Sequence, residues 1–393
     1  MKENSELFIS QKKIIKDELR CWIEFNLSKL KNNIDIIKSF ISDKIEIICV
    51  LRTNIYEFGY INIVKYLSVI GIKYFAVSTL EEAIALRKSS IQGEIIILNW
   101  TSITKKEILI QNNLTQALFS YNYTHKLNKL PNKVKSLIKI DTGIDLLGFN
   151  MSQIKFIKDC YTFENLKIEG IFTDLSLIQV NGNGKDNSKN THLEKFIYIL
   201  QILEKEGINI GKKFIINSLG IEDLKNYKYD LYSIGLLIFG FFPNQNNKLI
   251  NHALLESNFK PIISLRCKVM TIKYLKKGEK VGYNGKFISK EKTKIATISM
   301  GYADGLNFSC SKNKLKLIVK DKLCPLIGNI CMDCSIIKIP LDVTIKVGDT
   351  VTIFGYNNKG NYLNLDEFIL RNCLSIQEIS SRLSKRIKKL YHL

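Results

Sequence analysis

The stretch Ile47-Ile48-Cys49-Val50-Leu51 decides the fold class of this 393-residue chain. Five consecutive apolar residues predict a strand that is buried on both faces, as the strands of parallel sheets are. The next segment has an apolar stripe at helical spacing and ends at Gly71, and a second short apolar run follows at residues 74–77. A buried strand, a helix and another buried strand predict a parallel α/β unit.

The same alternation extends in both directions from this stretch. Upstream, Asn26 is placed to cap a helix with an apolar stripe, and downstream Thr79 and Glu82 have the spacing of a capping box. Eight buried strands are expected in all, at residues 47–51, 74–77, 95–98, 116–119, 136–140, 168–172, 214–216 and 231–237. Eight such units favour a TIM (β/α)8 barrel over an open sheet.

The pattern changes after about residue 245. Short alternating strands with turn signals follow, including residues 295–300 and 315–319, and they predict a mainly-β domain. We therefore expect a polar N-terminal leader at 1–20, a barrel at 21–250 and a C-terminal β domain at 251–393.

Composition limits the classes of function. Hydrophobic residues make up 46% of the chain and charged residues 24%, a globular balance. No apolar run reaches the length of a membrane helix, and the N-terminal residues lack a signal peptide, so we expect a cytoplasmic protein. The net charge of +21 invites a nucleic-acid interpretation, but the lysines are scattered along the chain. A bias toward lysine explains this charge without a nucleic-acid partner.

The cysteines and histidines give no recognisable site. Nine cysteines are present, and one pair has the C-x-x-C spacing, Cys331 and Cys334. Neither a second ligand pair nor a helix start accompanies that pair, so buried free thiols are expected there. The four histidines have no spacing typical of a metal site or a catalytic triad, and no phosphate-binding glycine fingerprint occurs.

Six segments in order along the chain resemble the alanine racemase family. The segment at residues 50–59, VLRTNIYEFG, is similar to the family's V-V-K-A-[DN]-A-Y-G-H-G. The other five are WIE at 22–24, KIDTG at 139–143, NS at 217–218, VGY at 281–283 with GYADG at 301–305, and GNICMD at 328–333.

The resemblance implies a pyridoxal phosphate (PLP) enzyme with a barrel and a β domain, which interconverts L- and D-alanine for cell-wall precursor supply. It implies a homodimer with shared sites, in which a catalytic tyrosine at the position of Tyr283 comes from the partner subunit and serves the second face of the substrate. It also assigns positions near the cofactor and the substrate. Those near the cofactor are Tyr56, Ser218, Ser233, Gly235 and Leu236, and those near a small amino-acid substrate are Tyr302 and Met332.

Arg52 occupies the position of the family lysine that binds PLP covalently and then acts as a base. A guanidinium has a pKa above about 12, so it neither forms the Schiff base nor accepts the substrate proton. Two further family positions also differ: Leu146 stands at that of an active-site arginine and Asp174 at that of a histidine. Ser233 replaces the arginine that contacts the pyridine nitrogen, although a serine still offers a hydrogen bond.

Three functions remain open from the sequence. The first is a PLP-dependent alanine racemase that works despite Arg52. The second is a catalytically inactive member that keeps the dimeric scaffold and binds PLP or another anion without a covalent bond. The third is a basic binding or interaction protein on the same scaffold. The set of substitutions around Arg52 favours the second.

Overall fold

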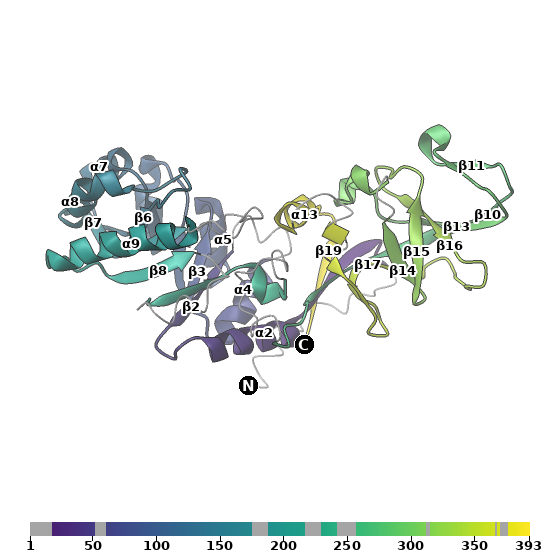
Figure 1. Ribbon diagram of the computed structural model, residues 1–393, viewed down its shortest axis with the longest axis horizontal. Coiled ribbons are helices and arrows are strands. Elements are labelled where there is room, and N and C mark those ends of the chain that lie inside the picture. The colour runs from purple at the N-terminus through teal and green to yellow at the C-terminus, as the bar shows by residue number, and fades with distance from the viewer. Residues whose placement is uncertain are drawn as a thin grey trace. The chain divides into compact units, whose positions relative to one another are not determined.

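The computed structural model describes residues 18–51, 60–174, 188–216, 229–241, 257–311, 315–365, 368–369 and 376–393. These residues divide into two compact units. One is built from residues 31–51 and the described residues of 61–259, and the other from residues 18–30 and the described residues from Lys260 onward. Figure 1 labels their elements. In the described residues no helix is long and apolar enough to cross a membrane.

The first unit is a closed barrel of eight parallel strands, as predicted. Strands β2 to β9 follow one another around it, and β9 closes the ring by pairing with β2, with Ile48 opposite Ser233. Their bounds are Glu46–Val50, Tyr74–Val77, Glu94–Ile97, Leu114–Leu118, Val134–Ile140, Leu166–Asp174, Lys212–Ile216 and Leu231–Ile234. The last strand is shorter than the predicted 231–237, because the chain turns at Gly235 into a 3-10 helix, η4, Leu236–Phe239.

Helices cover the outside of the barrel (Figure 1). Their bounds are α2 Leu27–Phe40, α4 Tyr60–Val69, α5 Leu80–Lys88, α6 Lys106–Gln111, α7 Tyr121–Lys129, α8 Ile154–Tyr161 and α9 Ser188–Lys205. The predicted caps are present: the Asn26 side chain accepts from the Lys29 amide at 2.8 Å, and Thr79 with Glu82 forms the capping box of α5.

Apolar side chains fill the barrel interior. Phe172 of β7 and Phe214 of β8 stack with their ring centroids 5.0 Å apart. Around them lies a cluster of smaller buried residues from all the strands except β7: Ile48, Ala76, Ile96, Leu98, Ala117, Leu137, Ile216 and Leu231. The barrel therefore encloses a packed apolar core.

The second unit is a nine-stranded sheet in the order β18-β17-β14-β15-β16-β13-β10-β1-β19. Its long strand β10, Ile263–Leu275, pairs antiparallel with β1, Cys21–Asn26. The remaining strands are β13 Thr293–Ile298, β14 Lys316–Val319, β15 Lys322–Ile327, β16 Ser335–Ile339, β17 Thr350–Tyr356, β18 Tyr362–Leu363 and β19 Lys388–His392. A small hairpin of β11, Lys280–Val281, and β12, Phe287–Ile288, and the helix α13, Ile376–Arg382, belong to the same part of the chain.

Strand β1 lies at the start of the segment that the sequence assigns to the barrel, 21–250, yet it pairs in the sheet of the C-terminal part. Its side chains explain why. Trp22, Ile23 and Phe25 are fully buried, and the carboxylate of Glu24 forms a buried ion pair with Arg266 of β10 at 3.0 Å. The terminal strand β19 joins the other edge of β1 in parallel register.

Candidate active site

The polar residues of the barrel lie just past the carboxyl ends of its strands, where TIM barrels carry their active sites. Leu51, the last residue before Arg52, is fully buried, and its amide donates to the Ala76 carbonyl at 2.6 Å. The chain thus follows the barrel wall up to the residue before Arg52. Arg52, Tyr56 and Ser218 lie outside the described residues.

The segment after β6 is organised by one carboxylate. Oδ1 of Asp141 accepts hydrogen bonds from the amides of Gly143, Ile144 and Asp145 at 2.9, 2.9 and 3.2 Å. Oδ2 accepts from the amide of Leu146 at 3.0 Å. Burial acts to raise the pKa of Asp141, but the four amide donors outweigh it and lower the pKa below its ordinary value. The carboxylate therefore holds this loop in one conformation.

The loop leaves the Leu146 side chain 79% exposed. An apolar side chain in water makes no ionic contact with a substrate, so the position of the family arginine carries no charge here.

Replacing Asp141 with Ala should destabilise the protein by about 1–3 kcal/mol, since four amides lose a charged acceptor. The folded-state pKa lies below the unfolded value of about 3.9, so this contribution is complete above that pH and is lost as the pH falls through the folded pKa. Urea unfolding at pH 7 and in acid measures it. Asp145→Asn, a nearby exposed carboxylate, is the control and should stay within about 0.5 kcal/mol. Equal effects of the two variants would contradict the assignment.

His192 packs beside the segment after β6, a contact that the sequence does not reveal. Its Nδ1 lies 3.3 Å from Oγ1 of Thr142, and that hydroxyl lies 3.4 Å from Oγ1 of Thr173, at the end of β7. Burial, and then the charge of Lys195, lowers the pKa of His192, partly offset by Asp141 and Asp145. Fifty residues separate His192 from Thr142, so only the barrel topology brings them together.

The end of β9 offers groups that suit an anion. Ser233 is buried near the end of the strand, and Gly235 and Leu236 follow at the start of η4. These are the positions near the cofactor that the resemblance assigns. Asp174 ends β7 and is half-buried.

Tyr283, Tyr302 and Met332 lie in the second unit, and all three side chains are exposed, at 72%, 45% and 55%. Two short segments present Tyr302 and Met332 side by side, because the Tyr302 and Ala303 amides donate to the carbonyls of Cys331 and Met332, each at 3.0 Å. Tyr283 begins a short 3-10 turn after Gly282, and its carbonyl accepts from the Asn329 amide group at 3.2 Å.

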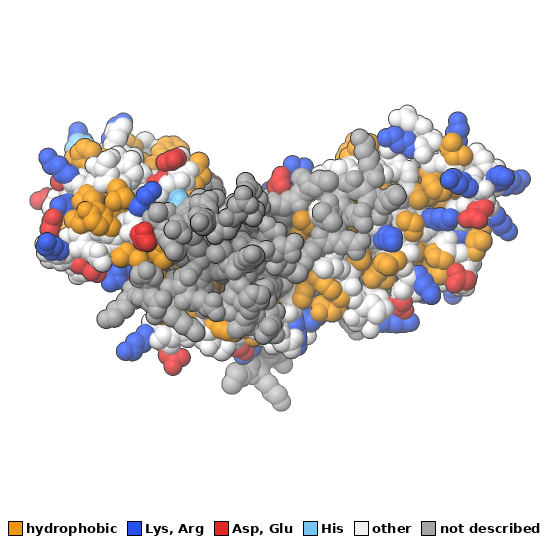
Figure 2. Space-filling view, in the orientation of Figure 1, with side chains coloured by type: hydrophobic (Ala, Val, Ile, Leu, Met, Phe, Trp, Pro, Cys, Tyr) orange, Lys and Arg blue, Asp and Glu red, His pale blue; other side chains and the backbone are white. Residues whose placement is uncertain are grey.

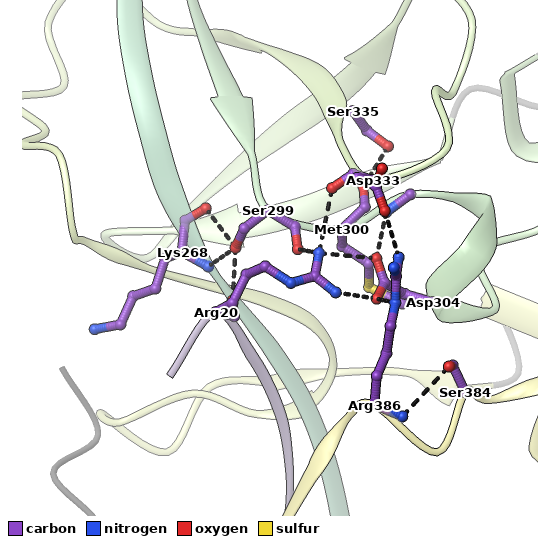
Figure 3. A network of polar contacts seen from close by, with 10 residues as sticks. Arg20, Lys268, Ser299, Met300, Asp304, Asp333, Ser335, Ser384 and Arg386 are labelled. Carbon is purple, nitrogen blue, oxygen red and sulfur yellow. Dashed lines mark hydrogen bonds and ion pairs between the residues drawn. The ribbon is translucent and has the colours of Figure 1, made fainter. Parts of the chain in front are cut away.

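A buried carboxylate anchors the segment that carries Tyr302 (Figure 3). Asp304 is fully buried, and two arginines contact its carboxylate. Arg20 donates from Nη1 to Oδ2 at 3.1 Å and pairs through Nη2 with Oδ1. Arg386 donates from Nε to Oδ1 at 2.7 Å. Arg386 also reaches Asp333 at 2.8 Å, next to Met332. We call Arg20, Asp304, Asp333 and Arg386 the Asp304 network.

The C-x-x-C thiols differ from the sequence prediction. Cys331 and Cys334 are free but half-buried rather than buried, because they flank an exposed turn formed by Met332 and Asp333. The described residues hold no group of three or more His, Cys, Asp or Glu side chains placed for a metal ion.

An eight-stranded parallel barrel followed by a mainly-β unit that exposes Tyr283 and Tyr302 defines the class of barrel protein to which this chain belongs. The family model "Alanine racemase, N-terminal domain" matches residues 25–243, and "Alanine racemase, C-terminal domain" matches residues 262–391. The chain belongs to the alanine racemase family.

Individual relatives cover almost the whole chain. It is 33% identical to the alanine racemase of Helicobacter acinonychis, over 94% of this chain and 98% of that protein. It is 31% identical to alanine racemase 2 of Caldanaerobacter subterraneus, over 95% and 96%. Among solved structures, the alanine racemase of Clostridium difficile 630 superimposes with a TM-score of 0.85 at 26% identity, over 95% of this chain and 96% of that one.

The residues present fit one part of PLP and not another. Buried Ser233 and the amides that open η4 are donors suited to an anionic or ring-nitrogen contact. At residue 52, where the resemblance places the covalent anchor, the sequence has an arginine, and a guanidinium is not suited to form a Schiff base.

Proposed function

We propose that this chain is a member of the alanine racemase family that binds PLP, or another small anion with phosphate or carboxylate groups, without a covalent bond. We propose that its interconversion of L- and D-alanine is lost or strongly reduced. The observation that carries this proposal is Arg52, which comes directly after Leu51 at the carboxyl end of β2.

The chemistry of the reaction makes Arg52 decisive. Removing the α-proton of an amino acid requires an electron sink, which PLP supplies when it is bound. The group on the protein must first bond to the cofactor and then accept a proton, and a guanidinium that stays protonated does neither. It does bind phosphate and carboxylate groups well, because its planar fork matches their oxygens.

Two described residues support the same proposal. The exposed Leu146 and the half-buried Asp174 replace the arginine and histidine that the family has at these positions. One removes a cation from the site and the other adds an anion. Both changes disfavour the binding of an amino-acid carboxylate there, and together with Arg52 they indicate a site whose role has changed.

We further propose a homodimer in which Tyr283 contributes to the site of the partner subunit. The support is the family resemblance together with the 72% exposure of this large side chain. A nucleic-acid role has less support. On the face that Figure 2 shows, lysine and arginine side chains are dispersed among acidic and apolar ones in both units and form no continuous stripe.

Borohydride treatment tests the proposed function. We expect the purified protein to bind PLP reversibly, and borohydride reduction to leave no cofactor on the chain, since no imine is present to be reduced. Intact-mass spectrometry after reduction and dialysis measures this. An alanine racemase with its lysine, such as a relative purified in parallel, is the positive control. PLP fixed to the natural chain, or L-to-D exchange at the rate of that relative, would overturn the proposal.

The competing function is an active alanine racemase, which the 33% identity over nearly the whole chain favours. It requires an amine other than residue 52 to take over both tasks of the missing lysine. Peptide mapping of the reduced protein distinguishes the two functions, because it would identify that lysine directly.

A further inference from the structure

The two thiols of the C-x-x-C segment differ from the other cysteines of the described chain. Cys331 and Cys334 are both half-buried, and the two residues between them, Met332 and Asp333, are exposed. Every other described cysteine is buried: Cys21, Cys49, Cys160, Cys267, Cys310 and Cys324. A reagent in solution thus reaches this pair before any other described thiol.

The backbone brings the pair to the spacing that a disulfide needs. The Cys331 amide donates to the Cys334 carbonyl at 2.9 Å. A backbone hydrogen bond between residues three apart keeps their Cα atoms close, as a disulfide requires. The Cys331 thiol donates to the Asn329 carbonyl at 3.8 Å, a single weak contact that a disulfide would replace.

Access to solvent distinguishes the pair from the other thiols more than ionisation does. Burial, and then the neighbouring Cys331, raises the pKa of Cys334. Burial raises the pKa of Cys160 to about 12 and that of Cys324 to about 11. The thiolate is the reactive form, so the deeply buried cysteines are protected both by their burial and by their protonation, whereas Cys331 and Cys334 are partly exposed.

The turn that holds the pair also supports residues of the candidate site. The carbonyls of Cys331 and Met332 receive the amides of Tyr302 and Ala303, each at 3.0 Å. The contact is close: a Cβ on Gly301 would lie 2.3 Å from each of these carbonyl oxygens. A change in the turn is therefore transmitted to the backbone of Tyr302.

Asp333, the second exposed residue of the turn, also fixes the turn through its own contacts. Its carboxylate pairs with Arg386 at 2.8 Å, and its carbonyl accepts from Arg20 Nη1 at 3.3 Å, both within the Asp304 network (Figure 3). The turn is thus fixed to the rest of the unit on both sides of Met332.

We propose that Cys331 and Cys334 form a reversible dithiol–disulfide site that reacts with low-molecular-weight disulfides and couples its redox state to the position of Tyr302. One thiolate attacks the disulfide, forms a mixed disulfide and releases one thiolate of the reagent. The second cysteine attacks the mixed disulfide, closes the bond between Cys331 and Cys334 and releases the other thiol. The two cysteines are oxidised, and the reagent is reduced to two thiols. This site is independent of the chemistry at Arg52.

Oxidised glutathione serves as the probe. The native full-length protein is incubated with it, the remaining thiols are blocked, and peptides are mapped by mass spectrometry. We expect an intrachain Cys331–Cys334 disulfide that dithiothreitol reverses, with the buried thiols still free. The Cys334→Ser variant should stop at the first step and accumulate glutathione on Cys331, whereas Cys324→Ser, which removes a buried thiol, should form the disulfide as the natural chain does.

Two measurements on the natural chain keep the proposal testable if a variant fails to fold. Phenylarsine oxide, which requires two neighbouring thiols, should bind and block the disulfide. Hydrogen exchange at the Tyr302 and Ala303 amides should change at least several-fold between the reduced and oxidised forms. If Cys331 and Cys334 stay free in excess oxidised glutathione, or if disulfides form only between chains, the proposed dithiol–disulfide site is wrong. Unchanged exchange at these amides would overturn the coupling to Tyr302.

Discussion

The Arg52→Lys variant is expected to bind PLP covalently in stoichiometric amount, whereas the natural chain binds it only reversibly. The substitution supplies an amine that can deprotonate and form the imine, which the guanidinium cannot. Because that amine also serves as a base on one face of the substrate, L-to-D exchange should rise by a factor on the order of 10²–10⁴. Intact mass after borohydride reduction and a D-alanine assay measure the two effects.

The control is Arg52→Gln, which removes the same guanidinium without adding an amine. It should fix no PLP and show no gain in exchange. Because Leu146 and Asp174 remain in the variant, we expect Arg52→Lys to stay slower than a natural alanine racemase. Failure of Arg52→Lys to fix PLP would show that more than one residue blocks the covalent bond, and fixation by Arg52→Gln would place the reactive amine elsewhere.

Much of the barrel can be predicted because most of its strands contain a short buried apolar run. The run at Ile47–Leu51 overlaps β2, Glu46–Val50, and the predicted strand 74–77 matches β3. The capping box of Thr79 and Glu82 is local in sequence, so it too is visible in advance. Closure of the eight strands into a ring is confirmed.

Long-range pairings leave no such local trace. Strand β1 looks like the entrance to the first barrel helix, but its partners are β10 and β19, far along the chain. The contacts of Asp304 with Arg20 and Arg386 span 284 and 82 residues. An isolated arginine in a sequence gives no sign that its partner is buried. The contact of His192 with Thr142 is hidden in the same way, because it depends on the barrel having closed.

The site itself could be predicted only as far as the family resemblance extends. The resemblance selected Ser233, Gly235 and Leu236, which the structure places at the end of β9. It did not indicate that Asp304 differs from its neighbours in the G-Y-A-D-G segment, although the carboxylate of Asp304 is fully buried. Burial and partnership are properties of the folded chain, so this residue emerged only from the structure.

Replacing Asp304 with Ala is expected to destabilise the protein by about 3 kcal/mol. Removing one member of a buried ion pair costs about 3–5 kcal/mol, because the remaining charge loses its compensation. The lower end applies here, since the side chains of Arg20 and Arg386 are 39% and 40% exposed and reach water once the carboxylate is gone. The Gly301 amide, which donates to Asp304 Oδ2 at 2.9 Å in a buried position, also loses its acceptor.

Asp333→Ala is the matched control, because it removes the other carboxylate that Arg386 contacts. Its side chain is 62% exposed, and exposed ion pairs contribute at most about 1 kcal/mol. Urea unfolding monitored by circular dichroism should therefore separate the two variants by about 2 kcal/mol or more. Hydrogen exchange should show the loss in Asp304→Ala concentrated at residues 301–305, where the buried carboxylate binds the backbone. Similar stabilities of the two variants would mean that Asp304 contributes no more to stability than the exposed Asp333 does. The proposed role of Asp304 in positioning Tyr302 would then be wrong.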